Sequence, residues 1–335
     1  MSRRPLLAAL GVLALLAGAV TYVVHARNGG AAETPSENAV PVVTGQPMRI
    51  DGHTLFFRNL ARGPDTGKLA AVPAADPDTA RRVGDLHCDR FAADHGTAIC
   101  LRLKPGSLPP VTDLLVLDAN LRELHHDTLP GTPSRARVSP DGRFVNWTLF
   151  VTGDSYAATG FSTRTGLYEV RTGRLVKSVE ELAVFVNGKR YYASDVNFWG
   201  ITFGADGNRF YLTMASKGKT YLIEADYRAY RGTAIAENVE CPSLSPDGRR
   251  IAYKQKVGNG VWRLAVLDLA TRRITHPPEI RSVDDQPVWQ GNDTLLYPLP
   301  NAAKTFDIWS VGLTTPPRLL IPQATTPSLP ETPSR

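Results

Sequence analysis

The chain lacks the sequence signatures on which common enzyme classes depend. It has no Gly-x-Ser-x-Gly nucleophile elbow, since residues 153–157 fail at the last position. Residues 63–68 resemble a phosphate-binding loop but are one residue short and lack the Ser or Thr that should follow, so a turn is expected there. No Asp-x-Asp-x-Asp-Gly calcium loop is present. These absences argue against an enzyme, and no cofactor or metal is expected.

Concentrated basic charge is also missing. The net charge of +6 is small for 335 residues, and the Lys and Arg residues form no stripe with interleaved aromatic residues. Nucleic-acid binding is therefore not expected. Adjacent His125, His126 and Asp127 suggest a metal site at first, but neighbours on a strand point to opposite faces and cannot chelate one ion together. An exposed strand edge is the better interpretation.

Long helical segments are scarce, and a turn recurs in their place. Few stretches offer ten or more residues at helical spacing without Gly, Pro or β-branched interruption, which disfavours a stacked-helix solenoid. Ser-Pro-Asp-Gly-Arg occurs at residues 139–143 and again at 245–249, with a looser Asp-Gly copy at 206–207. Each copy separates two strand-like runs. Asp-Gly in this setting is a strong hairpin signal, because Gly accepts the positive φ of a tight turn.

The spacing of these turns predicts the fold. Weaker turns at 51–52, 95–96 and 291–293 complete the series, and successive turn glycines are 44, 46, 65, 41 and 43 residues apart. Four-stranded propeller blades repeat every 40–50 residues or so, and the long step fits one blade plus an insertion of about twenty residues. We predict an all-β, six-bladed propeller of four-stranded antiparallel blades over residues 39–322, with an insertion at about 177–197. The turn glycines are Gly52, Gly96, Gly142, Gly207, Gly248 and Gly291.

Two blades show all four strands in the sequence. Alternating polar and apolar residues between turn signals predict these strands. For blade 5 they are residues 242–244, 250–255, 261–267 and 273–276. For blade 6 they are residues 287–289, 294–297, 306–311 and 318–321.

The repeat resembles that of a known family. The Ser-Pro-Asp-Gly-Arg turn, followed by Leu-Asp-Leu-Ala-Thr at residues 267–271, resembles the TolB-type, PD40-type repeat, a relative of the WD40 blade. The resemblance is clearest in blades 3 and 5 and covers about two thirds of the chain. With 29 Arg against 9 Lys, the chain is similar to exported TolB-like proteins of high-GC Gram-positive bacteria. The sequence leaves no room for the N-terminal domain of TolB itself, so a role in the Tol envelope system is not implied.

The amino terminus predicts export. Residues 5–24 carry no charge, follow Arg3 and Arg4, and would span about 30 Å as a helix, the thickness of a bilayer core. Residues 1–26 are therefore a signal peptide or a signal-anchor helix. Three alternatives stay open: a leader cleaved near Ala26, an uncleaved anchor favoured by the length, and a twin-arginine signal. The propeller would be extracellular on a single-pass membrane protein, or secreted. Residues 27–38 are expected to be a flexible linker and 323–335 a disordered tail.

The three cysteines are expected to play structural roles. Cys88 and Cys100 flank the turn at 95–96, so they lie on adjacent strands, and an oxidising exterior favours a disulfide between them. Their register is imperfect, and two buried thiols are the alternative. Cys241 begins a strand and is expected to be a small buried apolar residue.

Propeller topology indicates where a site would lie. Residues that enter the innermost strands share one face with the loops between second and third strands, opposite the Asp-Gly turns. Residues 152–165 and 177–199 bring aromatic residues toward that face, which suits recognition. The competing interpretation is that polar residues line a wet channel and that aromatics pack the insertion onto its own blade. The candidate ligand-binding residues at the channel mouth are Arg135, Asp195, Asn197, Trp199, Glu240, Asp284, Asp285 and Gln286.

Two functions follow from this placement. The first is a non-catalytic extracytoplasmic propeller that binds a protein, peptide or envelope polymer through its channel face, with the membrane contacted by the N-terminal helix. The alternative is a hydrolase or lyase acting on a sugar or lactone, with Asp195, Glu240 and Asp285 as acid–base groups. Cation binding by the acids at the mouth is a further hypothesis.

Overall fold

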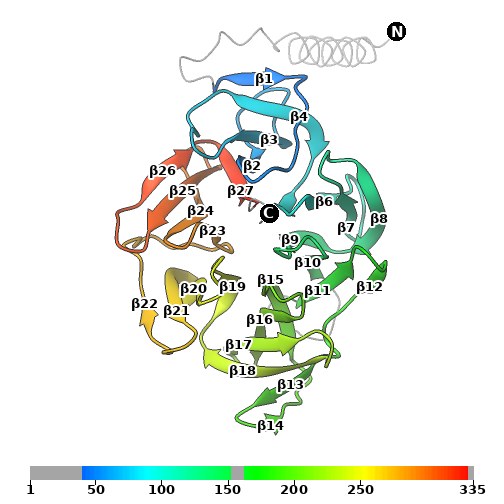
Figure 1. Cartoon of the computed structure of the whole chain (residues 1–335), viewed down its shortest axis with the longest axis vertical. Coiled ribbons are helices and arrows are strands. Elements are labelled where there is room, and N and C mark those ends of the chain that lie inside the picture. The colour runs from blue at the N-terminus through cyan, green and yellow to red at the C-terminus, as the bar shows by residue number, and fades with distance from the viewer. Residues whose placement is uncertain (1–39, 152–161, 331–335) are drawn as a thin grey trace, which may run out of the picture. The chain divides into compact units, whose positions relative to one another are not determined.

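The structure, a computed structural model, describes residues 40–151 and 162–330. These residues contain strands, turns and loops, and no helix among them is long and apolar enough to cross a membrane. They form six sheets that surround one axis (Figure 1). The predicted all-β, six-bladed propeller is therefore confirmed. The predicted leader helix at 1–26 and linker at 27–38 lie outside the described residues.

Each blade is built on four consecutive antiparallel strands, apart from the first. Blade 2 contains β5 (Arg90–Asp94), β6 (Thr97–Leu103), β7 (Val111–Leu117) and β8 (Glu123–Pro130). Blade 3 contains β9 (Thr132–Val138), β10 (Phe144–Val151), β11 (Ser162–Glu169) and β12 (Arg174–Val176). Blade 4 contains β15 (Asn197–Phe203), β16 (Arg209–Ser216), β17 (Lys219–Asp226) and β18 (Arg231–Glu237).

The predicted strands of the last two blades are confirmed with small shifts at their ends. Blade 5 contains β19 (Glu240–Leu244), β20 (Arg250–Gly258), β21 (Val261–Asp268) and β22 (Ile274–Thr275). Blade 6 contains β23 (Val288–Gln290), β24 (Thr294–Pro300), β25 (Phe306–Gly312) and β26 (Arg318–Ile321). The turn glycines of blades 2 to 6 all lie between the first and second strands of their blade, as the Asp-Gly pattern predicted.

Blade 1 is assembled from both ends of the described chain. Its second, third and fourth strands are β2 (Thr54–Asn59), β3 (Lys68–Pro73) and β4 (Arg81–His87), and β1 (Val42–Thr44) adds to β4 in parallel at the outer edge. Its innermost strand is β27 (Ala324–Ser328), which pairs antiparallel with β2 and brings Thr325 opposite Arg58. The ring of blades is thus closed by the last strand.

The prediction of a disordered tail from residue 323 is wrong for the part that the structure describes. Its polar, proline-containing composition suggested disorder, but an innermost strand faces the axis of the propeller and needs few apolar residues. Pairing with β2 compensates for the composition by satisfying backbone groups that would otherwise form an open edge. Residues 331–335 lie outside the described residues.

A buried arginine holds the closing segment in place. Arg81 in β4 is only 2% exposed, donates Nη1 to Asn59 Oδ1 at 2.7 Å and to Gln323 O at 3.1 Å, and donates Nη2 to Pro322 O. Burial lowers the pKa of the Arg81 guanidinium to about 10, although Asp307 raises it in part. Arg81 therefore links the fourth strand of blade 1, β4, to the chain that enters β27.

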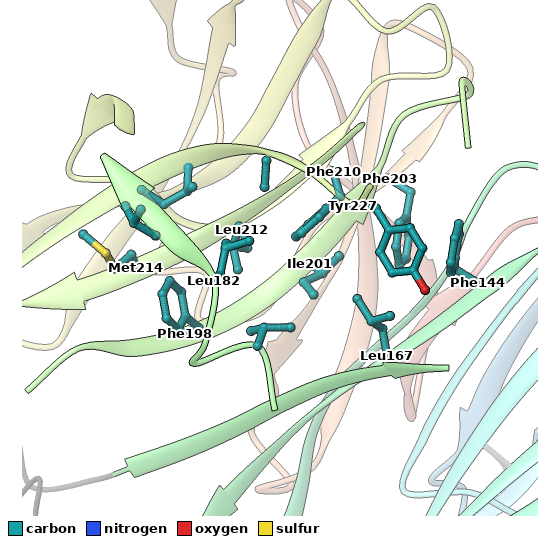
Figure 2. Close-up of a cluster of buried hydrophobic side chains, with 14 of the residues drawn as sticks. Phe144, Leu167, Leu182, Phe198, Ile201, Phe203, Phe210, Leu212, Met214 and Tyr227 are labelled. Carbon is teal, nitrogen blue, oxygen red and sulfur yellow. The ribbon is translucent and has the colours of Figure 1, made fainter. Parts of the chain in front are cut away.

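Apolar side chains fill the six seams between neighbouring blades. In β10, Val145, Trp147 and Leu149 belong to the cluster shared with blade 2, whereas Phe144 belongs to the cluster shared with blade 4. This split follows from the alternation of side chains along a strand. Figure 2 shows the seam between blades 3 and 4, where Phe144 and Leu167 meet side chains of blade 4. A blade can bury both of its faces only when it has two neighbours.

The insertion adds strands to the outer edge of blade 4 and does not reach the channel face. The insertion contains a small hairpin of β13 (Ala183–Val186) and β14 (Lys189–Arg190), joined by Asn187 and Gly188, both at positive φ. Strand β13 pairs in parallel with β18, the outer strand of blade 4 (Figure 1). Val179, Leu182 and Val184 are buried in the seam. The alternative interpretation, that the insertion packs onto its own blade, therefore describes these residues.

The structure contains a disulfide between Cys88 and Cys100, whose Cα atoms are 5.3 Å apart. Cys88 lies between β4 and β5, where the chain passes from blade 1 to blade 2, and Cys100 lies in β6. Their imperfect register arises because Cys88 precedes its strand. Cys241 in β19 is 1% exposed, as expected of a small buried residue.

We predict that Arg81→Ala destabilises the fold by about 3 kcal/mol, because it leaves the buried Asn59 Oδ1 and the partly buried carbonyls of Pro322 and Gln323 without this donor. Chemical denaturation monitored by tryptophan fluorescence measures this change. The neighbouring Arg82 is half-buried and has only a 3.4 Å hydrogen bond to Thr54, so Arg82→Ala should cost under about 1 kcal/mol. Equal costs for the two variants would contradict the role assigned to Arg81.

Reduction of the disulfide should lower the free energy of unfolding by about 2–3 kcal/mol, because the bond closes a short loop in the unfolded chain. The double variant Cys88→Ala with Cys100→Ala, compared with the oxidised wild type by thermal unfolding, provides the measurement. An unchanged midpoint would show that the two sulfurs are not bonded in the folded protein.

Candidate functional site

Two adjoining cavities of about 770 and 720 Å³ open at one end of the central channel. They share Arg90, Trp262 and Asp284, and we call them together the channel mouth. Their walls contain the first residues of innermost strands and the loops β20–β21 and β24–β25. The Asp-Gly turns of blades 3 to 5 contribute instead to a separate cavity of about 170 Å³, lined in part by Pro140, Ala205 and Gly248. The predicted division of the two faces matches this arrangement.

Asp285 is the centre of one ion-paired group at the mouth. Its carboxylate contacts Arg90 Nη1 at 2.6 Å and Arg135 Nε at 3.1 Å. Burial raises the pKa of the Asp285 carboxyl, but the charges of Arg135 and Arg90 lower it further, and the net pKa lies well below the ordinary value. The same carboxylate raises the pKa of the Arg135 guanidinium despite the opposing effect of burial. The group joins blades 2, 3 and 6 through fixed charges.

Lys254 is the centre of a second group. Its ammonium pairs with Asp284, lies 3.6 Å from Glu240 Oε2 and stands 4.4 Å from the centre of the Trp262 ring. Glu240 also accepts a hydrogen bond from Trp262 Nε1 at 3.0 Å. Burial lowers the pKa of Lys254, but Cys241, Asp284 and Glu240 raise it above its ordinary value. A cation, two anions and an aromatic ring are thus held in one arrangement.

The other predicted residues play different parts. Trp199 lines the larger cavity. Asn197 is buried, and its Oδ1 accepts hydrogen bonds from the backbone N and the hydroxyl of Thr163. Gln286 is buried and donates to Ile201 O and Pro242 O at 3.2 and 2.6 Å. Neither Asn197 nor Gln286 lines the mouth, so both hold the channel wall together.

Asp195 does not belong to the mouth either. Its carboxylate accepts a 2.5 Å hydrogen bond from Ser216 Oγ and a 2.6 Å bond from the Lys217 backbone N, which lowers its pKa. It therefore fastens the insertion to the β16–β17 turn. None of residues 177–197 lines either cavity of the mouth.

Three residues of the mouth were not predicted from the sequence: Arg90, Lys254 and Trp262. Arg90 stands six residues before its turn glycine, as Asp285 does, and this shared position was a usable signal. Lys254 lies opposite Glu240 of β19, but the register shifts between Glu240 and Ser243, so an unbroken strand pattern would not have paired these two residues. Trp262 enters β21 from the β20–β21 turn, and its direction follows from no local pattern.

The residues that the structure describes contain no group of three His, Cys, Asp or Glu side chains placed to hold a metal ion. His125 and His126 lie in β8 at the outer edge of blade 2. His126 Nε2 is 3.3 Å from Asp113 Oδ1, whereas the His125 ring stacks on Tyr168 at 4.4 Å. The two imidazoles have separate surroundings, as the alternation of a strand requires.

The fold and the mouth together define the class of this protein, a six-bladed β-propeller with an ion-paired channel mouth. Among solved structures, TolB from Acinetobacter baumannii is similar, with a TM-score of 0.58 and 14% identity over 83% of this chain and 67% of that chain. The propeller is therefore TolB-like in fold. No family model and no curated protein sequence matches the chain.

Two further structures share the fold. A chain of a nidogen/laminin complex has a TM-score of 0.54 and 12% identity, over 82% of this chain and 97% of that chain. An oligogalacturonate lyase from Vibrio parahaemolyticus has a TM-score of 0.50 and 13% identity, over 78% of this chain and 76% of that chain. At such identities the likeness concerns the fold alone.

Asp285→Asn should destabilise the protein by about 3–5 kcal/mol at pH 7, because the buried Arg135 and the partly buried Arg90 lose their counter-ion. The folded-state pKa of Asp285 lies below its unfolded value, so its stabilisation is complete above about pH 4 and is lost as the pH falls further. The difference between variant and wild type should therefore shrink in acid.

Urea denaturation from pH 7 to pH 3 measures this effect. Asp293→Asn is the matched control, because that side chain is 83% exposed and pairs with Arg250 at the surface, and it should change stability by less than about 0.5 kcal/mol. A constant difference between the Asp285 variant and the wild type across this range would contradict the ion-paired state.

Proposed function

We propose that this chain is a non-catalytic, exported propeller, membrane-tethered or secreted, that binds a protein, peptide or envelope polymer through its channel mouth. The observation that carries the proposal is the mouth itself. Its buried charges are satisfied by one another, so the floor keeps its shape without a ligand and little ordering is needed on binding.

The walls of the mouth supply surface for contact. Trp199 and Trp262 line it, and aromatic side chains of this kind often anchor binding partners. Leu103 and Phe306 line the smaller cavity and Phe150 the larger one, and each is between 37% and 43% exposed. Lys256 and Lys304 are exposed at its edge, one in each cavity. A rigid polar floor with apolar walls suits recognition of a partner with mixed chemistry.

The three carboxylates that the catalytic alternative requires all have partners within the protein. Asp285 is paired with two arginines, Glu240 bonds Trp262 and lies near Lys254, and Asp195 accepts hydrogen bonds at the β16–β17 turn. A general acid gives a proton to the substrate and a general base takes one from it. The ion pairs and hydrogen bonds of these carboxylates oppose such a proton transfer. The likeness to an oligogalacturonate lyase fold motivates a direct assay of the alternative, a lyase or hydrolase acting on a sugar or lactone.

We predict that reversing the charge of the two lysines at the edge of the mouth weakens partner binding. The full chain, tagged after Arg335, is used for proximity labelling on whole cells, and each labelled candidate is then tested with purified components. Lys256→Glu with Lys304→Glu should weaken binding at least tenfold, because both charges reverse at the mouth. Both side chains are exposed, so the fold should persist.

The matched control is Lys177→Glu with Lys189→Glu, two exposed lysines on the insertion away from the mouth. It should retain the partner. Equal binding by both double variants would refute the proposed surface. Cleavage of oligogalacturonate or lactone substrates by the wild type, lost in Glu240→Gln, would instead establish the catalytic alternative.

A further inference from the structure

The other end of the channel holds the cavity of about 170 Å³ described above, which we call the turn-side cavity. Arg137, Thr202, Ser243, Trp289 and Ser328 are among its lining residues. Pro246, Asp247 and Gly248 also line it and are exposed, so the cavity opens to solvent among the Asp-Gly turns. Nothing in the proposed function involves this end of the channel.

Arg137 is directed to this cavity by the period of its strand. Residues two apart on β9 point to the same side, so Arg135 and Arg137 both face the channel while Ala136 packs into the seam with blade 2. Arg135 lies nearer the mouth and pairs with Asp285. Arg137 lies one step further toward the turns, where it donates Nη2 to Pro287 O at 2.6 Å.

The charges of the channel leave Arg137 without a counter-ion. Asp285 is taken by Arg90 and Arg135, while Asp284 and Glu240 surround Lys254. Among the residues that the structure describes, no carboxylate forms an ion pair with Arg137. Burial lowers the pKa of the Arg137 guanidinium to about 10, with Asp285 raising it and Arg135 and Arg90 lowering it. An arginine in such surroundings is stabilised by an added anion.

Two carboxylates at the rim of the cavity disfavour an anion of more than one charge. Asp247 accepts hydrogen bonds from Ser245 Oγ at 2.6 Å and from the Arg249 backbone N at 3.1 Å, and Asp94 accepts one from the His95 backbone N at 2.9 Å. These carboxylates keep negative charge beside the cavity. A doubly charged phosphate would be repelled more strongly than a carboxylate.

We propose that the turn-side cavity binds a carboxylate through Arg137, either a small organic acid or the C-terminus of a peptide. The planar guanidinium presents paired donors that match a carboxylate, and one of its nitrogens is already oriented by Pro287 O. This site is distinct from the channel mouth, so its test is independent of the test of the proposed function.

Thermal unfolding of the full chain in increasing acetate, with chloride replacing acetate at constant ionic strength, tests the proposal. Acetate should raise the midpoint of the wild type along a saturating curve, because a ligand that binds only the folded state stabilises it. Arg137→Gln should lose this response. The control Arg249→Gln removes an exposed arginine of the Asp-Gly turn at residues 247–248 and should keep it.

Acetyl-dialanine with a free C-terminus, compared with its amide, distinguishes the two sources of the carboxylate. A response to acetate alone assigns small acids, and a response to the acid peptide as well extends the site to chain termini. An equal response to acid and amide, an acetate response that persists in Arg137→Gln, or none in the wild type would overturn the proposal. If Arg137→Gln does not fold, Arg137→Lys replaces it and should bind acetate at least tenfold more weakly.

Discussion

The pairing of β27 with β2 is the interaction on which the rest of this structure depends. Every blade buries its two faces against neighbours, so an open row of six blades would leave two apolar faces in water. The last strand, β27, completes blade 1 with residues from the C-terminal part of the chain, so blades 1 and 6 become neighbours and neither face stays open. Arg81 then fixes the segment that leads into β27 through Asn59, Pro322 and Gln323.

Closure also creates the channel and sets its chemistry. Innermost strands from different blades bring together residues that are far apart in the sequence, such as Arg90, Arg135 and Asp285. Charges placed so close to the axis are shielded from water and must be paired, which they are at the mouth. Arg137, for which the described part of the chain offers no ion-pair partner, lies at the opposite end. The two ends of a single channel therefore offer different surfaces: a rigid mouth with paired charges, and a small cavity beside an unpaired cation.

Local signals predicted the blades well because the Asp-Gly turns of blades 3 to 5 each join the first two strands of their own blade. Gly142 and Gly248 need only nearby residues to specify their turns, so blade number and most strands followed from the sequence. The strand that closes the ring could not be found in this way, since Thr325 pairs with Arg58 and no local pattern links them. Its polar residues imitate a disordered tail because they face the channel.

The candidate site was predicted in part for the same reason. Arg135, Glu240, Asp284 and Asp285 were identified from their position at the start of innermost strands, and the structure brings all four to the mouth. Three other residues occupy similar positions but form hydrogen bonds to neighbouring loops and strands: Asp195, Asn197 and Gln286. Such hydrogen bonds depend on tertiary contacts, which the sequence pattern does not reveal. Cys241 lies at positive φ, and Glu240 and Lys254 are paired beside the irregularity in register that accompanies it. The sequence carries no signal for such a distortion.

Hydrogen–deuterium exchange of the backbone amides of β27 tests most directly whether closure holds the channel together. If β27 is an integral part of the ring, its hydrogen-bonded amides should exchange only through global unfolding, with the same free energy as those of β2 and β24. Arg81→Ala should lower all three together. Fast exchange in β27, with β2 and β24 still protected, would show a frayed terminus and would contradict the account of a ring closed by its last strand.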